Sequence, residues 1–347
     1  MPYRTIQWAT GAMGRASLRT MIDHPDVELV GVYTYSAEKA GRDAGELAGR
    51  PETGVRATDR LEEILAVDAD VVVHAGQLKP YTEHVDDFVV LLESGKNVIC
   101  LNGYSNPEHW DSEHTRRLQA ACEKGGASFM GAGMNPGVVI EQLATTVSGL
   151  CSRVDHIAIT ECFDSAPIRN PHYLFAMLGF GASVDVDPND PTWGPAAALN
   201  PMYEEAVSAL ALRLGMVLER VSTAHELLPA TEDLHLPAGT VAAGTVSHTR
   251  WRWIGHVGGR PMITLTINWY VESSHLDAEP RMWTVDIEGQ PCVSLHAEVS
   301  KNPADLSRMG PEQYGVGGVI VNALPHVVDA PTGIVVRPLS TPYRHVW

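Results

Sequence analysis

Three small residues near the start of the chain, Ala9, Gly11 and Gly14, have the spacing of a phosphate-binding turn. The run at 5–8 before them is typical of a strand, a helix-like segment follows them, and residues 27–33 are typical of a second strand. This order of elements holds the pyrophosphate of a dinucleotide at a helix N-terminus, where free backbone N–H groups attract anions. Gly11 lets the backbone approach phosphate, and Gly14 lets the helix pack closely on the strand. The alternative is a βαβ unit whose glycines serve only the turn.

The first of these positions carries alanine where the dinucleotide fingerprint has glycine. A tight turn tolerates alanine while φ stays negative, so we expect a negative φ angle at Ala9. The dinucleotide is expected to contact this turn and the loops that follow the predicted parallel strands, at 74–80, 102–110 and 131–137. The predicted cofactor-binding residues are Thr10, Gly11, Met13, Gly14, Arg15, Ser36, Lys39, Arg42, His74, Ala75, Asn102 and Asn135.

The end of the second strand indicates which dinucleotide binds. An enzyme that uses NAD usually has Asp or Glu there to accept hydrogen bonds from the ribose 2′-hydroxyl. Here Ser36, Lys39 and Arg42 follow the strand instead, and Arg15 can reach the same edge. A hydroxyl and cations suit a 2′-phosphate dianion. We therefore expect NADP(H) to be preferred, with NAD(H) possible; the alternative is a solvated loop, and the nearby Glu38 counts against a phosphate.

Composition limits the possible partners and compartment. The chain has 347 residues and a formal net charge of −17, which argues against nucleic acid and anionic membranes as partners. We expect neither a membrane-spanning segment nor a signal peptide, because no apolar run is long enough to cross a membrane and the first residues are typical of a strand. The five cysteines are scattered without a CxxC pair, which suits a reducing cytoplasm. The histidines show no metal-binding spacing with acids, so we expect no metal.

Helical and strand patterns alternate up to about residue 130, which predicts an α/β fold. We expect an N-terminal Rossmann domain with a parallel, doubly wound sheet over residues 1–140. A second, α+β domain is expected over 141–314, built on an open, mostly antiparallel sheet in which Gly258-Gly259 forms a hairpin turn. Residues 315–347 are expected to return to the cofactor domain.

The second sheet shows an aromatic surface. Trp251, Trp253 and Trp269 give one of its faces more aromatic area than a solvated face normally has. We expect a homodimer that forms through this sheet. The alternative is a cover formed by the chain's own helices.

The order of motifs resembles the dihydrodipicolinate-reductase-like oxidoreductases, specifically the branch of 2,4-diaminopentanoate dehydrogenases and native amine dehydrogenases. The matching segments run nearly the full length in the family's order: 7–11, 32–47, 133–137, 178–181, 321–325 and 330–333. The true dihydrodipicolinate reductases look less similar. Residues 329–333 echo their Asp-Ala-Pro-Ser-Gly stretch, but lie at the C-terminus without the expected preceding lysine.

This resemblance implies reversible reductive amination by an oxidoreductase that acts on CH–NH2 groups. A small ketone or aldehyde and ammonia form an imine, which accepts hydride, and a buried glutamate binds ammonium and relays protons. Family members place that glutamate in the loop after the fifth strand. In this chain that loop spans residues 102–110 and contains a single glutamate, Glu108, which we therefore assign as catalytic. If Glu108 instead lies in solvent at a helix start, Tyr104 is the nearest proton donor.

Candidate substrate contacts combine aromatic and polar side chains. They are Tyr104, Phe163, Tyr173, Phe175 and His275, with Met177 and Phe180 beside them. Such a stripe is also typical of a core, and its apolar character weakly favours small aliphatic or cyclic ketones and amines over amino acids. Three functions remain open: an NADPH-linked amine dehydrogenase, an NADP-dependent reductase of another C=O, C=N or C=C group without ammonia, and a non-catalytic dinucleotide-binding module.

Overall fold

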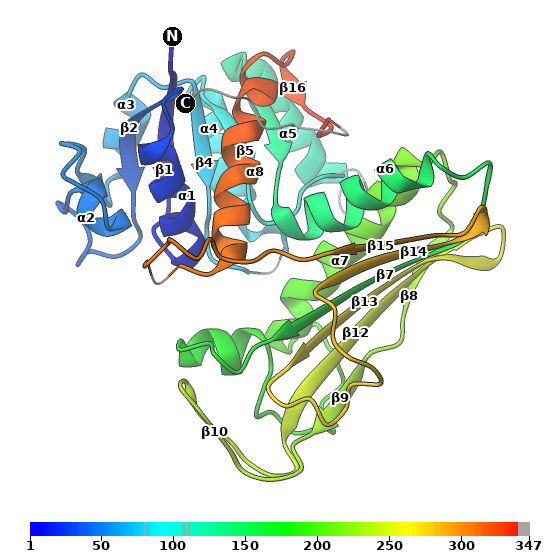
Figure 1. Ribbon diagram of the computed structural model, residues 1–347. Helices are drawn as coiled ribbons and strands as arrows, with labels where there is room; N and C mark the ends of the chain where they lie inside the picture. The colour runs from blue at the N-terminus through cyan, green and yellow to red at the C-terminus, as the bar shows by residue number, and fades with distance from the viewer. Residues whose placement is uncertain (80, 107–108, 110–111, 308, 339–347) are drawn as a thin grey trace. The chain divides into compact units, whose positions relative to one another are not determined.

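The computed structural model describes residues 1–79, 81–106, 109, 112–307 and 309–338 (Figure 1). The chain divides into two compact units. Unit 1 comprises Met1–Gln77, Thr82–Val138 and Val299–Trp347, and unit 2 comprises Leu78–Tyr81 and Val139–Glu298. The division at 138 lies two residues before the boundary expected at 140, and the division at 298 lies sixteen residues before the boundary expected at 314. Among the described residues, no helix combines the length and apolar character needed to cross a membrane.

Unit 1 is built on a seven-stranded sheet in the order β16-β6-β5-β4-β1-β2-β3. All of its strand pairs are parallel. The strands are β1 (Tyr3–Trp8), β2 (Val27–Tyr33), β3 (Ala57–Thr58), β4 (Val71–His74), β5 (Asn97–Cys100), β6 (Ser128–Gly131) and β16 (Gly333–Ile334). The predicted Rossmann sheet is confirmed. Its ligand-binding edge is the one at which β1, β4 and β5 end.

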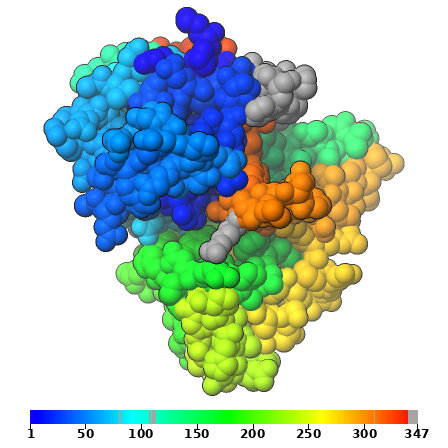
Figure 2. Space-filling view, turned by 60° about the vertical axis from the view of Figure 1, so that its left-hand side comes forward, coloured from blue at the N-terminus to red at the C-terminus, as the bar shows by residue number. Residues whose placement is uncertain are grey.

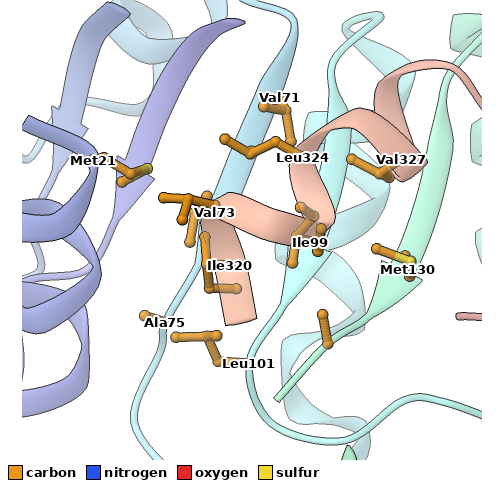
Figure 3. Packing of buried hydrophobic residues seen from close by; sticks show 13 residues of the cluster. Met21, Val71, Val73, Ala75, Ile99, Leu101, Met130, Ile320, Leu324 and Val327 are labelled. Carbon is orange, nitrogen blue, oxygen red and sulfur yellow. The ribbon is translucent and has the colours of Figure 1, made fainter. Parts of the chain in front are cut away.

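Helices cover this sheet. They are α1 (Ala12–Asp23), α2 (Ala44–Ala48), α3 (Leu61–Ala66), η1 (Tyr81–His84), α4 (Val85–Glu93), α5 (Ser112–Gly125) and α8 (Pro311–Val328), and η3 (Met134–Leu143) leads into unit 2. In Figure 1 the orange α8 lies beside the dark blue α1, and the two helices are in contact. Ile320 and Leu324 of α8 pack with Met21 of α1 and with Val73 and Ile99 of the sheet (Figure 3). The C-terminal segment thus completes the core of unit 1.

Unit 2 contains a second seven-stranded sheet in which β7 and β13 pair in parallel and the other pairs are antiparallel. Its strands are β7 (Arg153–Asp164), β8 (Arg220–Thr223), β9 (Glu226–Pro229), β12 (Val246–Val257), β13 (Arg260–Tyr270), β14 (Trp283–Gln290) and β15 (Val293–Ala297). A separate hairpin is formed by β10 (Leu234–Leu236) and β11 (Gly239–Val241), and the helices are α6 (Ala144–Ser148), η4 (His172–Met177) and α7 (Gly194–Arg213). Gly258 and Gly259 have φ angles of 59° and 72°, as a two-residue hairpin turn requires.

The tryptophan face of this sheet is covered by the chain itself. Trp251 and Trp253 are 1% and 0% exposed. The Tyr203 ring of α7 lies 4.6 Å from that of Trp253, and Trp193, just before α7, stacks 5.8 Å from Trp251. The expectation that these tryptophans form a dimer interface is therefore wrong. Helix α7, which is buried over most of its length, covers this apolar face within one chain.

Candidate functional site

The turn after β1 leaves an open helix N-terminus. Gly11 is the residue before α1, with φ −69° and ψ −165°, and no side chain caps the helix. No acidic residue occupies the first turn of the helix, and a Cβ added at Gly11 would meet nothing within 4 Å. Gly11, Ala12 and Met13 are exposed. Free N–H groups, the positive end of the helix dipole and open space together suit a pyrophosphate.

The close packing expected at Gly14 is present. A Cβ there would lie 2.3 Å from the carbonyl oxygen of Ala9 and 2.9 Å from its carbonyl carbon. These are backbone atoms that cannot rotate away. The side chain at 14 must therefore be a hydrogen atom for α1 to pack on the end of β1.

The expectation of a negative φ at Ala9 is wrong, because its φ is 70°. Buried hydrogen bonds hold this left-handed conformation. The Gln7 side-chain amide donates to the carbonyl oxygens of Ala9 at 3.0 Å and Trp8 at 3.1 Å, and the Ser17 hydroxyl donates to Gln7 Oε1 at 2.7 Å. The Ala9 N–H also donates to the Tyr33 carbonyl. Tertiary contacts thus impose a glycine-like turn on an alanine.

We expect the substitution Ala9→Gly to stabilise the protein by about 0.5–1 kcal/mol. A left-handed alanine costs about 1–2 kcal/mol, and the added freedom of glycine in the unfolded chain offsets about 0.4–1 kcal/mol of the gain. Urea unfolding measures the difference. Ala16→Gly, in the buried middle of α1, is the control and should destabilise by about 1 kcal/mol. If Ala9→Gly destabilises the protein as Ala16→Gly does, the backbone at Ala9 is not strained.

Cations and hydroxyls gather where β2 ends. Lys39 Nζ donates to the Thr10 carbonyl at 2.9 Å, and the Thr10 and Thr34 hydroxyls lie 3.1 Å apart. Burial, together with the charges of Arg15 and Arg42, lowers the pKa of Lys39. Arg42 also forms an exposed ion pair with Glu46 at 2.8 Å. In Figure 2 the blue N-terminal part of unit 1 forms a continuous surface. Because the charges of both arginines act on Lys39, the structure brings together Arg15, Lys39 and Arg42, three of the predicted phosphate-binding residues.

The predicted contacts after β4 and β5 face the protein. His74 is fully buried, and burial lowers its pKa to about 4, so its ring is neutral at physiological pH. Ala75 is also buried, and the Asn102 amide donates to the Gly76 carbonyl at 3.0 Å, which joins the two strand ends. Tyr104 is 1% exposed, with its ring against Phe88, and burial raises the pKa of its hydroxyl. This environment disfavours Tyr104 as a proton donor.

Glu108 lies outside the described residues, so its assigned role stays a prediction. The loop at 131–137, which contains the predicted contact Asn135, packs against protein. A Cβ at Gly131 would lie 2.2 Å from the Gly103 carbonyl oxygen. Arg337, which the sequence interpretation missed, is buried and donates to the Gly131 and Gly133 carbonyls at 3.2 Å. The glycines therefore serve close packing in this loop.

The predicted substrate contacts of unit 2 are spread over three elements. Tyr173 and Phe175 lie on η4, Phe163 lies on β7, and His275 follows β13, where its Nε2 donates to the Pro229 carbonyl at 2.7 Å. Phe175, together with Phe180, lines an open cavity of about 450 Å³. That cavity is lined by Phe175, Ala176, Phe180, Gly181, Ala182 and Thr240.

A buried carboxylate in unit 2 was missed. Glu161 of β7 accepts the indole N–H groups of Trp269 at 2.8 Å and Trp283 at 2.5 Å, one on each oxygen. The sequence carried a signal, because Ile157, Ile159 and Glu161 alternate on one face of the strand. An acid at an inward position of such a strand indicates a buried polar contact.

In unit 1, the first turn of the parallel sheet leads to a helix N-terminus without acidic residues, and cations lie at the end of the second strand. These features define a Rossmann-type dinucleotide-binding protein. Residues 5–127 match the family model described as dihydrodipicolinate reductase, N-terminus. The chain is 28% identical to an amine dehydrogenase of Streptomyces virginiae, covering 95% of this chain and 94% of the relative. It is 22% identical to the 2,4-diaminopentanoate dehydrogenase of Acetoanaerobium sticklandii, covering 95% and 91%.

The same fold occurs in a solved amine dehydrogenase of Mycobacterium smegmatis. Its TM-score is 0.80 at 22% identity, with 99% of this chain and 98% of that chain covered. The predicted resemblance is confirmed: the N-terminal part of the chain matches the dihydrodipicolinate reductase model, and nearly the whole chain is similar to amine and 2,4-diaminopentanoate dehydrogenases.

Proposed function

We propose that this protein is an NADP(H)-dependent amine dehydrogenase that catalyses reversible reductive amination of a small ketone or aldehyde with ammonia. One observation carries the proposal: an acid-free helix N-terminus beside Lys39, Arg15 and Arg42, in a chain that aligns over nearly its full length with amine dehydrogenases. The open space at Gly11 and the nearby hydroxyls fit a phosphorylated dinucleotide. When bound, the nicotinamide supplies the hydride.

The chain's own residues have three tasks in this reaction. The turn at Gly11 and Gly14 binds and orients the pyrophosphate, and Lys39 and Arg15 neutralise a 2′-phosphate. Glu108 binds ammonium and moves protons between the amine nitrogen and solvent. A dry pocket preserves the imine against hydrolysis. Phe175 and Phe180, which line the cavity of unit 2, favour an apolar substrate.

Ammonia dependence tests this function directly. Purified protein is supplied with NADPH and a panel of small aliphatic and cyclic ketones, with and without ammonium, and NADPH absorbance is followed. Oxidation of NADPH that requires ammonium, and amine formation, are expected. Turnover without ammonium would favour the second candidate, a reductase of another C=O, C=N or C=C group. Tight NADPH binding without turnover on any substrate would contradict both enzymes.

We expect the substitution Lys39→Ala to lower kcat/KM for NADP about 10- to 100-fold and to change that for NAD less than about 3-fold. A hydrogen bond to a charged group contributes about 1.5–3 kcal/mol, and only NADP carries the 2′-phosphate. Steady-state kinetics with both cofactors measure the effect. Arg60→Ala is the control, since its cation pairs with Glu62 and Glu63 on the surface. Equal losses with both cofactors would contradict the phosphate role.

We also propose a homodimer, which forms through the face of the second sheet opposite to α7. On the central strands this face carries Ala158, Thr160, Thr264 and Thr266, all half-buried, in register across β7 and β13. Light scattering should give about twice the chain mass of 37.6 kDa. Thr266→Arg should reduce it to one chain, because a charge at the centre of an interface loses its solvation. A monomeric parent protein would contradict this arrangement.

A further inference from the structure

A histidine–carboxylate cluster lies in unit 1, where β4 ends beside β1. It consists of His74 at the end of β4, His84 at the end of η1 and Asp87 in the first turn of α4. One possible ligand atom from each residue lies within 4.8 Å of the other two. His74 Nε2 is 3.4 Å and His84 Nδ1 is 3.8 Å from Asp87 Oδ2. The two imidazoles are buried, and the Asp87 side chain is 32% exposed.

The hydrogen bonds of His84 fix its tautomer. Its Nε2 lies 2.8 Å from the Gln77 carbonyl oxygen, which only accepts, so Nε2 carries the proton. In the neutral ring Nδ1 is then a bare lone pair, and it has no hydrogen-bond partner among the described residues. This lone pair faces the Asp87 carboxylate. A cation between these two acceptors, either a proton on the ring or a metal ion, would satisfy both of them.

The donor set has the chemistry that a metal needs. One imidazole nitrogen from each histidine and one carboxylate oxygen of Asp87 converge on one point. Tetrahedral zinc with bonds of about 2.0–2.1 Å places its ligand atoms about 3.3 Å apart. The two separations from Asp87 are 3.4 and 3.8 Å, and all three ligand atoms lie within 4.8 Å of one another.

Outer contacts orient these groups. The Tyr35 hydroxyl donates to Asp87 Oδ2 at 2.8 Å and accepts the Trp8 indole N–H at 2.8 Å. Metal-binding histidines and carboxylates usually have such partners, and the bond from His84 to Gln77 is of the same kind. Gly76 leaves room for both rings, because a Cβ there would lie 2.7 Å from the Cε1 atoms of His74 and His84.

We propose that His74, His84 and Asp87 bind one divalent transition-metal ion, preferably Zn²⁺, with water as the fourth ligand. The ion joins the end of β4 to the start of α4. Two nitrogen donors and one carboxylate suit zinc better than magnesium or calcium, which prefer oxygen ligands. The sequence analysis predicted no metal because the histidines and acids lack metal-binding spacing along the chain. In the fold, His74 at the end of β4 lies near His84 and Asp87, which follow it by ten and thirteen residues.

Zinc titration of the full-length chain tests the proposal. The protein is prepared without a polyhistidine tag, treated with EDTA, and titrated with Zn²⁺ against a chromophoric chelator. One high-affinity ion per chain is expected. His84→Ala and Asp87→Asn should each weaken binding about 100-fold or more, because each removes one of three protein ligands. His235→Ala, an exposed histidine of β10, is the matched control and should bind as the parent does.

A second measurement separates loss of the site from loss of the fold. The thermal unfolding temperature of the parent should rise on adding Zn²⁺, and it should not rise for Asp87→Asn, whose side chain has the same size as aspartate. Absence of stoichiometric Zn²⁺ binding by the parent chain would overturn the proposal even if a variant failed to fold. Binding that survives both ligand substitutions would overturn it as well. A protonated His84 paired with Asp87 would then explain the cluster.

Discussion

Replacing Glu108 by glutamine is expected to lower kcat/KM for ketone amination about 10²- to 10⁴-fold and to leave NADPH affinity within about 3-fold of the parent. Glutamine keeps the size of the side chain but removes the negative charge that holds ammonium and the basic site that accepts a proton. The assignment rests on the resemblance and on the position of Glu108 after β5. Steady-state kinetics with ammonium and a fluorescence titration with NADPH measure the two quantities.

The control for this substitution is Glu123→Gln. Glu123 is an exposed residue of α5 that accepts a hydrogen bond from Gln119, and its loss should leave both quantities unchanged. Unaltered amination by Glu108→Gln would contradict the assigned role, and the nucleotide fold would be unaffected by that result. A loss of NADPH affinity equal to the loss of rate would instead indicate a structural role for Glu108.

The parallel sheet was predictable because its signals are local. Short apolar runs such as residues 71–73 alternate with helical segments, and right-handed crossovers between parallel strands then restrict the order of the strands. The hairpin turn at Gly258-Gly259 was predictable for the same reason. Two consecutive glycines readily adopt the positive φ angles that such a turn requires, and both do so in the structure. The cation group at Lys39 also follows from sequence position, because it depends on where one strand ends.

The remaining features depend on contacts between distant residues. The left-handed Ala9 is stabilised by Gln7 and Ser17, whose side chains meet only after the helix has formed. The burial of Trp253 depends on a ring about fifty residues earlier in the sequence, on α7. Arg337 reaches the loop after β6 from the far end of the chain. Hydrophobic pattern and turn chemistry carry no information on such pairings.

The substitution Gly14→Ala is expected to destabilise the protein by about 3 kcal/mol and to weaken NADPH binding about 100-fold or more. Its Cβ would lie 2.3 Å from the carbonyl oxygen of Ala9, so α1 must move away from the end of β1. Overpacking of this kind costs about 1–3 kcal/mol, and here the obstacle is backbone. The same shift removes the helix N-terminus from the phosphates. Urea unfolding and NADPH titration measure the two effects.

Gly11→Ala separates binding from stability at the same turn. Its backbone has a negative φ and its Cβ would meet no protein atom within 4 Å, so unfolding free energy should change by less than about 0.5 kcal/mol. The new methyl group nevertheless occupies the space through which a phosphate approaches the backbone, and NADPH affinity should fall about 10-fold. If Gly11→Ala binds NADPH as well as the parent does, the pyrophosphate cannot lie at this helix N-terminus. If Gly14→Ala is as stable as Gly11→Ala, close packing is not the reason for glycine at position 14.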